Sequence, residues 1–190
     1  MRQDTLYDMW SNRNPQWEKR YEDIFNKFTD YGRGNSSMRE DRGKIFGAGY
    51  ELFIIAFFIG LYYNERRKLT EDNQKRKSFG HPIKFWGNLD SVKGRKEYPE
   101  LRKYIFISLI AKTDIDFIAL EKGEMTPQKA VGMLMQTMEE YANWGLNFIA
   151  DRMIDDPNFF YKETAFLEVF LTFNSSSQDS VNVEEPESLD

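Results

Sequence analysis

Apolar residues recur at three- and four-residue steps in several stretches of the chain, a spacing that places them on one face of an α-helix. The first helix is expected to begin at Asn14-Pro15, because proline suits the first helical position, and to end near Tyr31-Gly32. Its apolar positions are Trp17, Tyr21, Ile24, Phe25 and Phe28. Residues 32–38, rich in Gly, Asn and Ser, are expected to form a loop.

The second half of the chain predicts three more helices. One opens at Tyr98-Pro99 and continues to Lys122-Gly123, where glycine favours a stop. The next begins with the capping residue and proline of Thr126-Pro127 and ends at Asp155-Asp156-Pro157, after which the last helix follows. Their apolar faces include Leu101, Ile105, Leu109, Val131, Leu134, Met138, Tyr141, Gly145, Phe148, Phe159, Phe160, Phe166, Val169 and Phe170.

The segment 45–63 differs from these amphipathic helices, because Glu51 is its only charged residue. One interpretation is a central helix that neighbouring helices bury on nearly all sides, and which forms the hub of the core. The alternative is a single membrane span, followed by Arg66 and its basic neighbours as an anchor. The buried helix is favoured, because Glu51 would cost about 2–3 kcal/mol in lipid. Gly47, Gly49 and Gly60 would let neighbouring backbones approach closely.

A long polar connection follows over residues 64–97, and its aromatic residues Phe79, Phe85 and Trp86 indicate that it is ordered and packed. From Asn174 onward Ser, Asn and Glu replace the apolar pattern, which predicts a disordered acidic tail over 174–190. No period-two pattern indicates a strand. The expected fold is therefore all-α, with a single irregular bundle of about five helices in residues 1–173.

Charge is unevenly distributed along the chain. Residues 1–63 are balanced, residues 64–103 carry twelve basic and six acidic side chains, and residues 104–190 carry five basic and sixteen acidic ones. The basic middle is expected to face outward and to contact an anionic partner.

Few residues are available for catalysis or metal binding. The chain has no cysteine and a single histidine, His81, which precedes a proline. No phosphate-binding glycine loop or nucleophile motif occurs. Asp151 and Asp155 lie one helical turn apart, so a carboxylate-dependent enzyme is kept as an alternative. We expect no enzyme activity, no cofactor and no metal.

The best-supported binding residues lie in the basic middle of the chain. Basic side chains neutralise phosphates, and aromatic rings can stack on exposed bases. An isoelectric point of about 5.1 argues against a free-standing DNA-binding protein, so a solvated charged loop and a surface that docks an acidic protein partner are together favoured over direct DNA contact. The predicted site consists of Arg66, Arg67, Lys68, Lys75, Arg76, Lys77, Lys84 and Trp86.

Residues 43–69, in which an aromatic and alanine-containing helix runs directly into Asn64-Glu65-Arg66-Arg67-Lys68-Leu69, resemble small helical accessory proteins of bacterial DNA-phosphorothioation (dnd-type) defence systems. The resemblance covers this segment alone. It implies a DNA-associated, non-catalytic component that works with enzymatic partners.

The leading hypothesis is therefore a helical subunit of a bacterial protein–DNA assembly, in defence or DNA modification. Protein partners and DNA are its expected ligands, and the pattern does not predict an oligomeric state. The polar N-terminus, Met1-Arg2-Gln3-Asp4-Thr5, is not followed by an apolar signal-peptide core, so a cytoplasmic location is expected.

Overall fold

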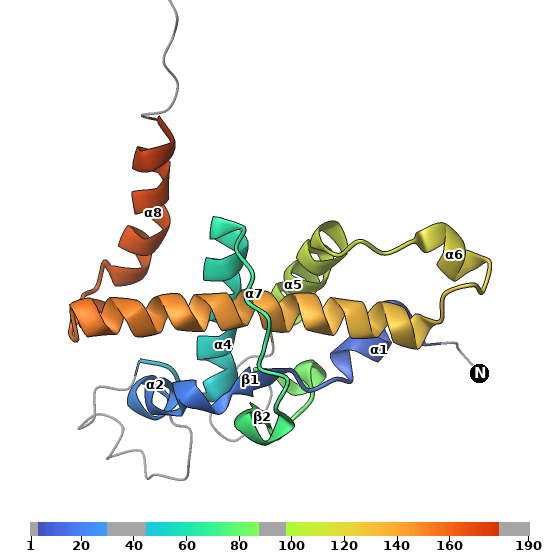
Figure 1. Cartoon of the computed structure of the whole chain (residues 1–190), viewed down its shortest axis with the longest axis horizontal. Coiled ribbons are helices and arrows are strands. Elements are labelled where there is room, and N and C mark those ends of the chain that lie inside the picture. The colour runs from blue at the N-terminus through green and yellow to red at the C-terminus, as the bar shows by residue number, and fades with distance from the viewer. Residues whose placement is uncertain (1–3, 30–44, 88–97, 179–190) are drawn as a thin grey trace, which may run out of the picture.

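The computed structural model describes residues 4–29, 45–87 and 98–178, with side chains up to Leu171. It is mainly helical, and one long helix runs through the whole molecule (Figure 1). In chain order the elements are α1 (Leu6–Ser11), β1 (Gln16–Glu18), η1 (Lys19–Tyr21), α2 (Glu22–Phe28), α4 (Gly49–Tyr63), η2 (Asn73–Lys75), β2 (Arg76–Ser78), η3 (Ile83–Phe85), α5 (Pro99–Lys112), α6 (Phe117–Glu121), α7 (Pro127–Asp155), η5 (Phe159–Tyr161) and α8 (Ala165–Gln178). The predicted loop 32–38 and residues 179–190 of the predicted acidic tail lie outside the described residues.

Helix α7 is the element on which the others pack, so the prediction that segment 45–63 forms the hub is wrong. Helix α7 has 29 residues, and along its length it contacts α1, β1, α4, α5 and η5. The predicted cap is confirmed, because the Thr126 side chain accepts a hydrogen bond from the Lys129 backbone N–H and Pro127 follows it. The predicted end at Asp155 is confirmed as well.

Helix α4 crosses α7 with the two backbones in contact. A Cβ atom on Gly60 would lie 2.2 Å from the carbonyl oxygen of Tyr141, and one on Gly145 would lie 1.9 Å from that of Ala56. Real Cβ atoms essentially never come that close, so only glycine fits at both positions. The predicted close approach at Gly60 is confirmed. Phe53, Phe57 and Ile59 of α4 are fully buried around this crossing.

Within the described residues, no helix combines the length and the apolar character needed to cross a membrane. Helix α4, the apolar segment, has 15 residues. Glu51 in its first turn accepts hydrogen bonds from the Gly47 backbone N–H at 2.7 Å and from the Tyr98 hydroxyl at 2.9 Å. The one charge in the apolar segment is thus satisfied at the helix N-terminus, where a carboxylate is favoured.

The predicted helix from Asn14-Pro15 is wrong in its first turns. Residues Gln16–Glu18 form β1, which pairs antiparallel with β2, and a 3-10 turn then leads into α2. Trp17 is buried in this short strand against Phe25, with ring centroids 4.3 Å apart, and against Phe79. A three-residue strand is too short to show a period-two pattern, so the sequence gives no signal for it.

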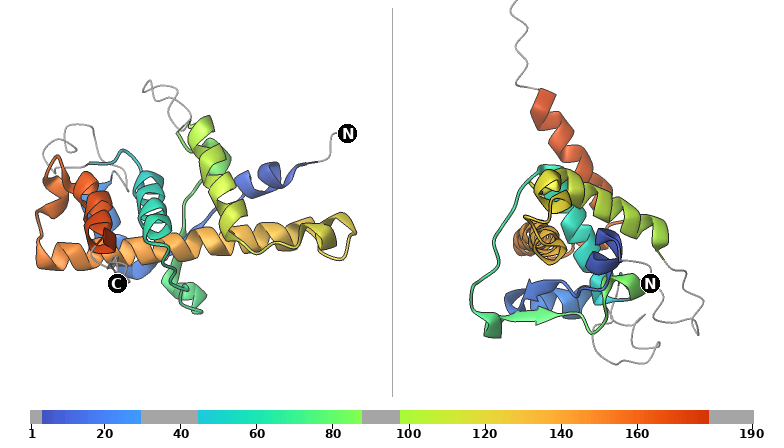
Figure 2. Two further views of the ribbon diagram at one scale, coloured as in Figure 1. Left: turned by 90° about the horizontal axis from the view of Figure 1, so that it is seen from above. Right: turned by 90° about the vertical axis from the view of Figure 1, so that its right-hand side faces the viewer.

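The remaining differences concern helix boundaries. The helix predicted from Tyr98-Pro99 to Lys122-Gly123 is interrupted after Lys112, and α6 begins anew behind Asp116, whose side chain accepts from the Ala119 backbone N–H. Helix α8 extends to Gln178, past the change in composition at Asn174. Helices α4 and α5 lie on the same side of α7 (Figure 2).

Candidate functional site

A segment that we call the strap, residues 64–75, joins α4 to β2. It passes α7 on the side opposite α4, as the two figures of the whole chain show (Figures 1 and 2). It begins at Asn64, the one non-glycine residue with positive φ in the described chain (φ 55°), which ends α4 as a left-handed cap. Most of the predicted binding residues lie on the strap or on β2 directly after it.

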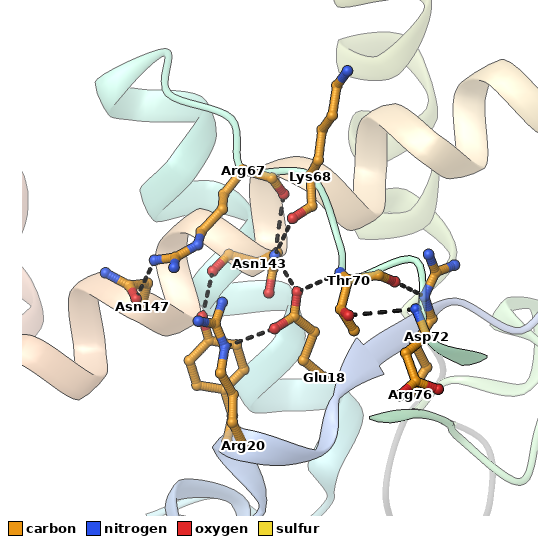
Figure 3. A network of polar contacts seen from close by, with 10 residues as sticks. Glu18, Arg20, Arg67, Lys68, Thr70, Asp72, Arg76, Asn143 and Asn147 are labelled. Atoms are coloured by element: carbon orange, nitrogen blue, oxygen red, sulfur yellow. Dashed lines mark hydrogen bonds and ion pairs between the residues drawn. The ribbon is translucent and has the colours of Figure 1, made fainter. Parts of the chain in front are cut away.

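Two buried side chains hold the strap against α7 (Figure 3). Glu18 of β1, only 6% exposed, accepts hydrogen bonds from the Thr70 backbone N–H at 2.8 Å and from the Asn143 side-chain amide at 3.1 Å. Its other carboxylate oxygen lies 2.6 Å from Arg20 Nε. The Asn143 amide also lies 3.1 Å from the carbonyl oxygens of Arg67 and Lys68. A buried carboxylate and amide therefore satisfy partly buried backbone groups of the strap.

Three of the predicted cations are anchors of this arrangement and face the protein. Arg67 donates its backbone N–H to the Glu140 carbonyl oxygen at 3.0 Å and its guanidinium to the side-chain oxygen of Asn147. Arg76 donates to the Thr70 carbonyl oxygen at 2.5 Å and to Gln16 at 3.3 Å. Lys77 forms an ion pair with Glu22 and lies over the Trp17 ring. These half-buried groups hold the strap and β2 in place.

Trp86 is the clearest correction to the predicted site. It is fully buried, and its ring stacks on Tyr50 with 5.5 Å between centroids and 9° between planes. Phe53 and Phe79 contact it edge to face at about 6 Å. The predicted packing of the loop aromatics is thus confirmed for Phe79 and Trp86, and for that reason Trp86 cannot stack on a nucleic-acid base.

The other four predicted residues are exposed cations. Arg66 places its guanidinium over the Tyr141 ring, 4.6 Å from the centroid, and also bonds the Lys112 carbonyl oxygen. Lys75 lies 3.5 Å from Asp72 in an exposed pair, and Lys84 lies over the neighbouring Phe85 ring. Lys68 has no ion-pair partner among the described side chains, and it points away from the network (Figure 3). The outward charge of the strap is therefore smaller than the sequence indicates.

A polar cavity of about 450 Å³ lies between the strap and α7, with Glu139 on its wall. Glu139 accepts a hydrogen bond from the Gln16 backbone N–H at 2.8 Å. Burial raises the pKa of Glu139 from 4.5 to about 7, against the opposing effects of that hydrogen bond and of Arg76. The cavity mixes carboxylates with Lys68 and Arg76, so it has no single charge preference.

Glu139 makes stability depend on pH. The folded chain holds this proton more tightly than the unfolded chain, so its stabilising contribution is complete below pH 4.5 and is lost as the pH rises through about 7. Glu139→Gln is expected to raise the free energy of unfolding at pH 8 by about 2 kcal/mol and to leave it nearly unchanged at pH 4. Urea titrations across this range measure the effect. Glu163→Gln, at an exposed carboxylate, is the control, and an equal change there would contradict the assignment.

Asp151 and Asp155 lie one turn apart on the exposed face of α7, as predicted, but they border a different kind of site. They share a cavity of about 410 Å³ with Tyr63, Trp144 and Phe148. In the part of the chain that the structure describes, no three histidine or carboxylate side chains gather where they could hold a metal ion. The sequence placed Phe148 on the apolar face of this helix, and so gave no signal for its partly open position or for that of Trp144.

Comparison of the chain with protein-family models, curated proteins and solved structures finds no match. What the fold and the site define is a mainly helical protein with a polar strap fixed across its longest helix.

Proposed function

We propose that the protein is a non-catalytic helical subunit of a bacterial protein–DNA assembly, in defence or DNA modification. The resemblance of residues 43–69 to accessory proteins of phosphorothioation systems motivates the class of assembly. In this proposal the outer side of the strap contacts DNA phosphates or an acidic surface of a protein partner. Arg66, Lys68, Lys75 and Lys84 make these contacts, while Arg67, Arg76 and Lys77 support them from behind.

The observation that carries the proposal is the fixed backbone beneath the exposed cations. The strap is bonded to Glu18, Glu140 and Asn143, so Lys68 leaves it from a backbone position that is already ordered. A pre-organised cation needs little further ordering when it meets a phosphate. Because only a few phosphates would be neutralised, binding is weak for the subunit alone and depends strongly on salt. This agrees with a component that acts beside larger partners.

Neither alternative hypothesis gains a supporting observation. Asp151 and Asp155 are exposed side chains without a third carboxylate or histidine beside them among the described residues, so nothing favours a carboxylate-dependent enzyme. For the membrane-span alternative, the apolar segment 45–63 instead packs across α7, with Gly60 against the Tyr141 backbone. The helical subunit is thus the function that the geometry supports best.

Charge reversal on the strap tests the proposal. Lys68→Glu with Lys75→Glu is expected to weaken binding to a fluorescent DNA duplex at low salt by about tenfold or more, because two phosphate contacts are replaced by repulsion. Fluorescence anisotropy measures the affinity and its salt dependence. The matched control is Lys122→Glu with Lys129→Glu, two exposed lysines near the start of α7, which changes the net charge equally.

Equal losses in both double variants would show that only net charge matters and would contradict the proposed site. If the unmodified chain does not bind DNA, the proposed ligand of the strap is the acidic surface of a protein partner. In that case a partner that co-purifies with the unmodified chain from the native host is expected to be lost from the variant Lys68→Glu with Lys75→Glu. Retention of the same partners by this variant would refute that form too.

A further inference from the structure

The cavity beside Asp151 and Asp155 has an aromatic wall. Tyr63, Trp144 and Phe148 are half-buried, and their ring centroids lie 5.3–5.7 Å from one another. The rings of Trp144 and Phe148, one turn apart on α7, are stacked at 26°. Tyr63 completes the wall from the end of α4, and its hydroxyl is fixed by donation to the Val169 carbonyl oxygen at 2.8 Å. The wall is therefore built from two helices that cross in the core.

Carboxylates continue the same face of α7. Asp151 and Asp155 follow Trp144 and Phe148 at the next helical steps, and both are exposed. Asp151 accepts one hydrogen bond, from the Asn147 side chain at 2.7 Å, which leaves most of its acceptor capacity open. The Asp155 side chain has no hydrogen-bond or ion-pair partner among the described residues. Two exposed carboxylates thus stand at the edge of an aromatic surface, and Arg152 lines the same cavity.

The cations nearby are already engaged. The guanidinium of Arg152 lies over the Phe159 ring, 4.6 Å from its centroid, and 6.0 Å from that of Phe148. Arg67 is bonded to Asn147. These two positive charges reduce the negative potential of the cavity. A cationic ligand must therefore be attracted by the ring faces and the carboxylates together. Of the three rings of the wall, Phe148 is the one that Arg152 approaches, so the cation–π contacts of Tyr63 and Trp144 are not taken up by this guanidinium.

We propose that this cavity binds an alkylammonium or guanidinium group, presented as the lysine or arginine side chain of a protein partner. Aromatic faces attract such a cation through their quadrupole, and a carboxylate within reach adds a charge-assisted hydrogen bond. The volume of about 410 Å³ leaves room for the side chain and part of its backbone. The site is separate from the exposed cations of the strap, so the inference stands whether or not the strap binds DNA.

The indole N–H signals of the four tryptophans provide the readout. Trp10, Trp17 and Trp86 are at most 1% exposed, and Trp144 alone is half-buried in the cavity wall. In proton–nitrogen NMR spectra, N-acetyl-lysine methylamide and N-acetyl-arginine methylamide are expected to shift the Trp144 signal saturably and to leave the other three in place. Trp144→Phe assigns the signal. The uncharged isostere N-acetyl-norleucine methylamide is expected to leave it unmoved, and a polyamine shows whether a free amine binds as well as a peptide side chain.

Asp151→Asn with Asp155→Asn is expected to weaken binding of the lysine probe by about tenfold or more, while the other indole signals show that the fold is intact. The control, Glu121→Gln with Glu124→Gln, removes two exposed carboxylates near α6 and is expected to have no effect.

A Trp144 signal that does not shift with either amino-acid probe, or that shifts equally with the norleucine probe, overturns the proposal. Unchanged affinity after loss of the two carboxylates overturns it too. A Trp144 signal that shifts with a single-stranded oligonucleotide and with no other probe would overturn the proposal and assign the rings to base stacking. Tighter binding of the polyamine than of either amino-acid probe would refute a protein partner.

Discussion

Gly145→Ala is expected to lower the free energy of unfolding by more than about 4 kcal/mol, enough to leave much of the protein unfolded. The reason is the crossing of α4 and α7, where the added methyl group would lie 1.9 Å from the Ala56 carbonyl oxygen. That atom belongs to helix backbone and cannot rotate away, so the two helices would have to separate. Separation would expose Phe53 and Phe57, which are now fully buried. Thermal and urea denaturation, followed by circular dichroism, measure the loss.

Gly132→Ala, on the same helix, is the matched control. A Cβ atom there meets open space, and alanine favours a helix over glycine. The variant is therefore expected to gain about 0.5–1 kcal/mol. Similar losses at both glycines would mean that α7 tolerates no alanine for reasons unrelated to the crossing, and the packing described for α4 would be wrong.

Asn143→Ala is expected to lower the free energy of unfolding by about 3 kcal/mol, the second largest effect in this group of substitutions. Asn143 is 1% exposed, and its amide serves both the Glu18 carboxylate and strap carbonyl oxygens. Alanine removes the donor but leaves the buried carboxylate with one partner fewer. A buried charge that loses a hydrogen bond is costly, so the loss exceeds that of an ordinary surface bond.

The control for this substitution lies one turn further along α7. Asn147→Ala removes a half-buried amide that donates to exposed Asp151 and accepts from half-buried Arg67, so its partners are less buried than those of Asn143. Water can replace these hydrogen bonds, so a loss of about 1 kcal/mol or less is expected. If Asn143→Ala costs no more than Asn147→Ala in urea titrations, the buried network does not hold the strap.

Sequence reasoning could predict those parts of the fold that depend on neighbours in the chain. The start of α7 at Thr126-Pro127 and its end at Asp155 follow from local capping chemistry, and both are confirmed. The close approach at Gly60 could be predicted because a glycine inside an apolar helix has little other use. Gly145, its counterpart on α7, was seen only as one step of an apolar stripe, because nothing local indicates which helix crosses there.

The candidate site was predicted less well, because it depends on pairings between distant residues. Strand β1 pairs with β2 across about sixty residues of chain, and Glu18 meets Asn143 across more than a hundred. Neither pairing has a sequence signal. Trp86 was predicted both to pack in an ordered loop and to bind a partner beside the basic residues, and its fully buried ring confirms the packing alone. The cations that turn inward, such as Arg67 and Arg76, could not be told from those that face outward.

Hydrogen exchange of the strap tests the central claim, that this segment is fixed across α7 and holds its exposed cations in place. The backbone N–H of Arg67 bonds the Glu140 carbonyl oxygen and that of Thr70 bonds Glu18, so both are expected to exchange nearly as slowly as the core of α7. In Asn143→Ala the same two amides should exchange much faster than the α7 core. Exchange of Arg67 and Thr70 in the unmodified chain at the rate of an unstructured peptide would contradict this account.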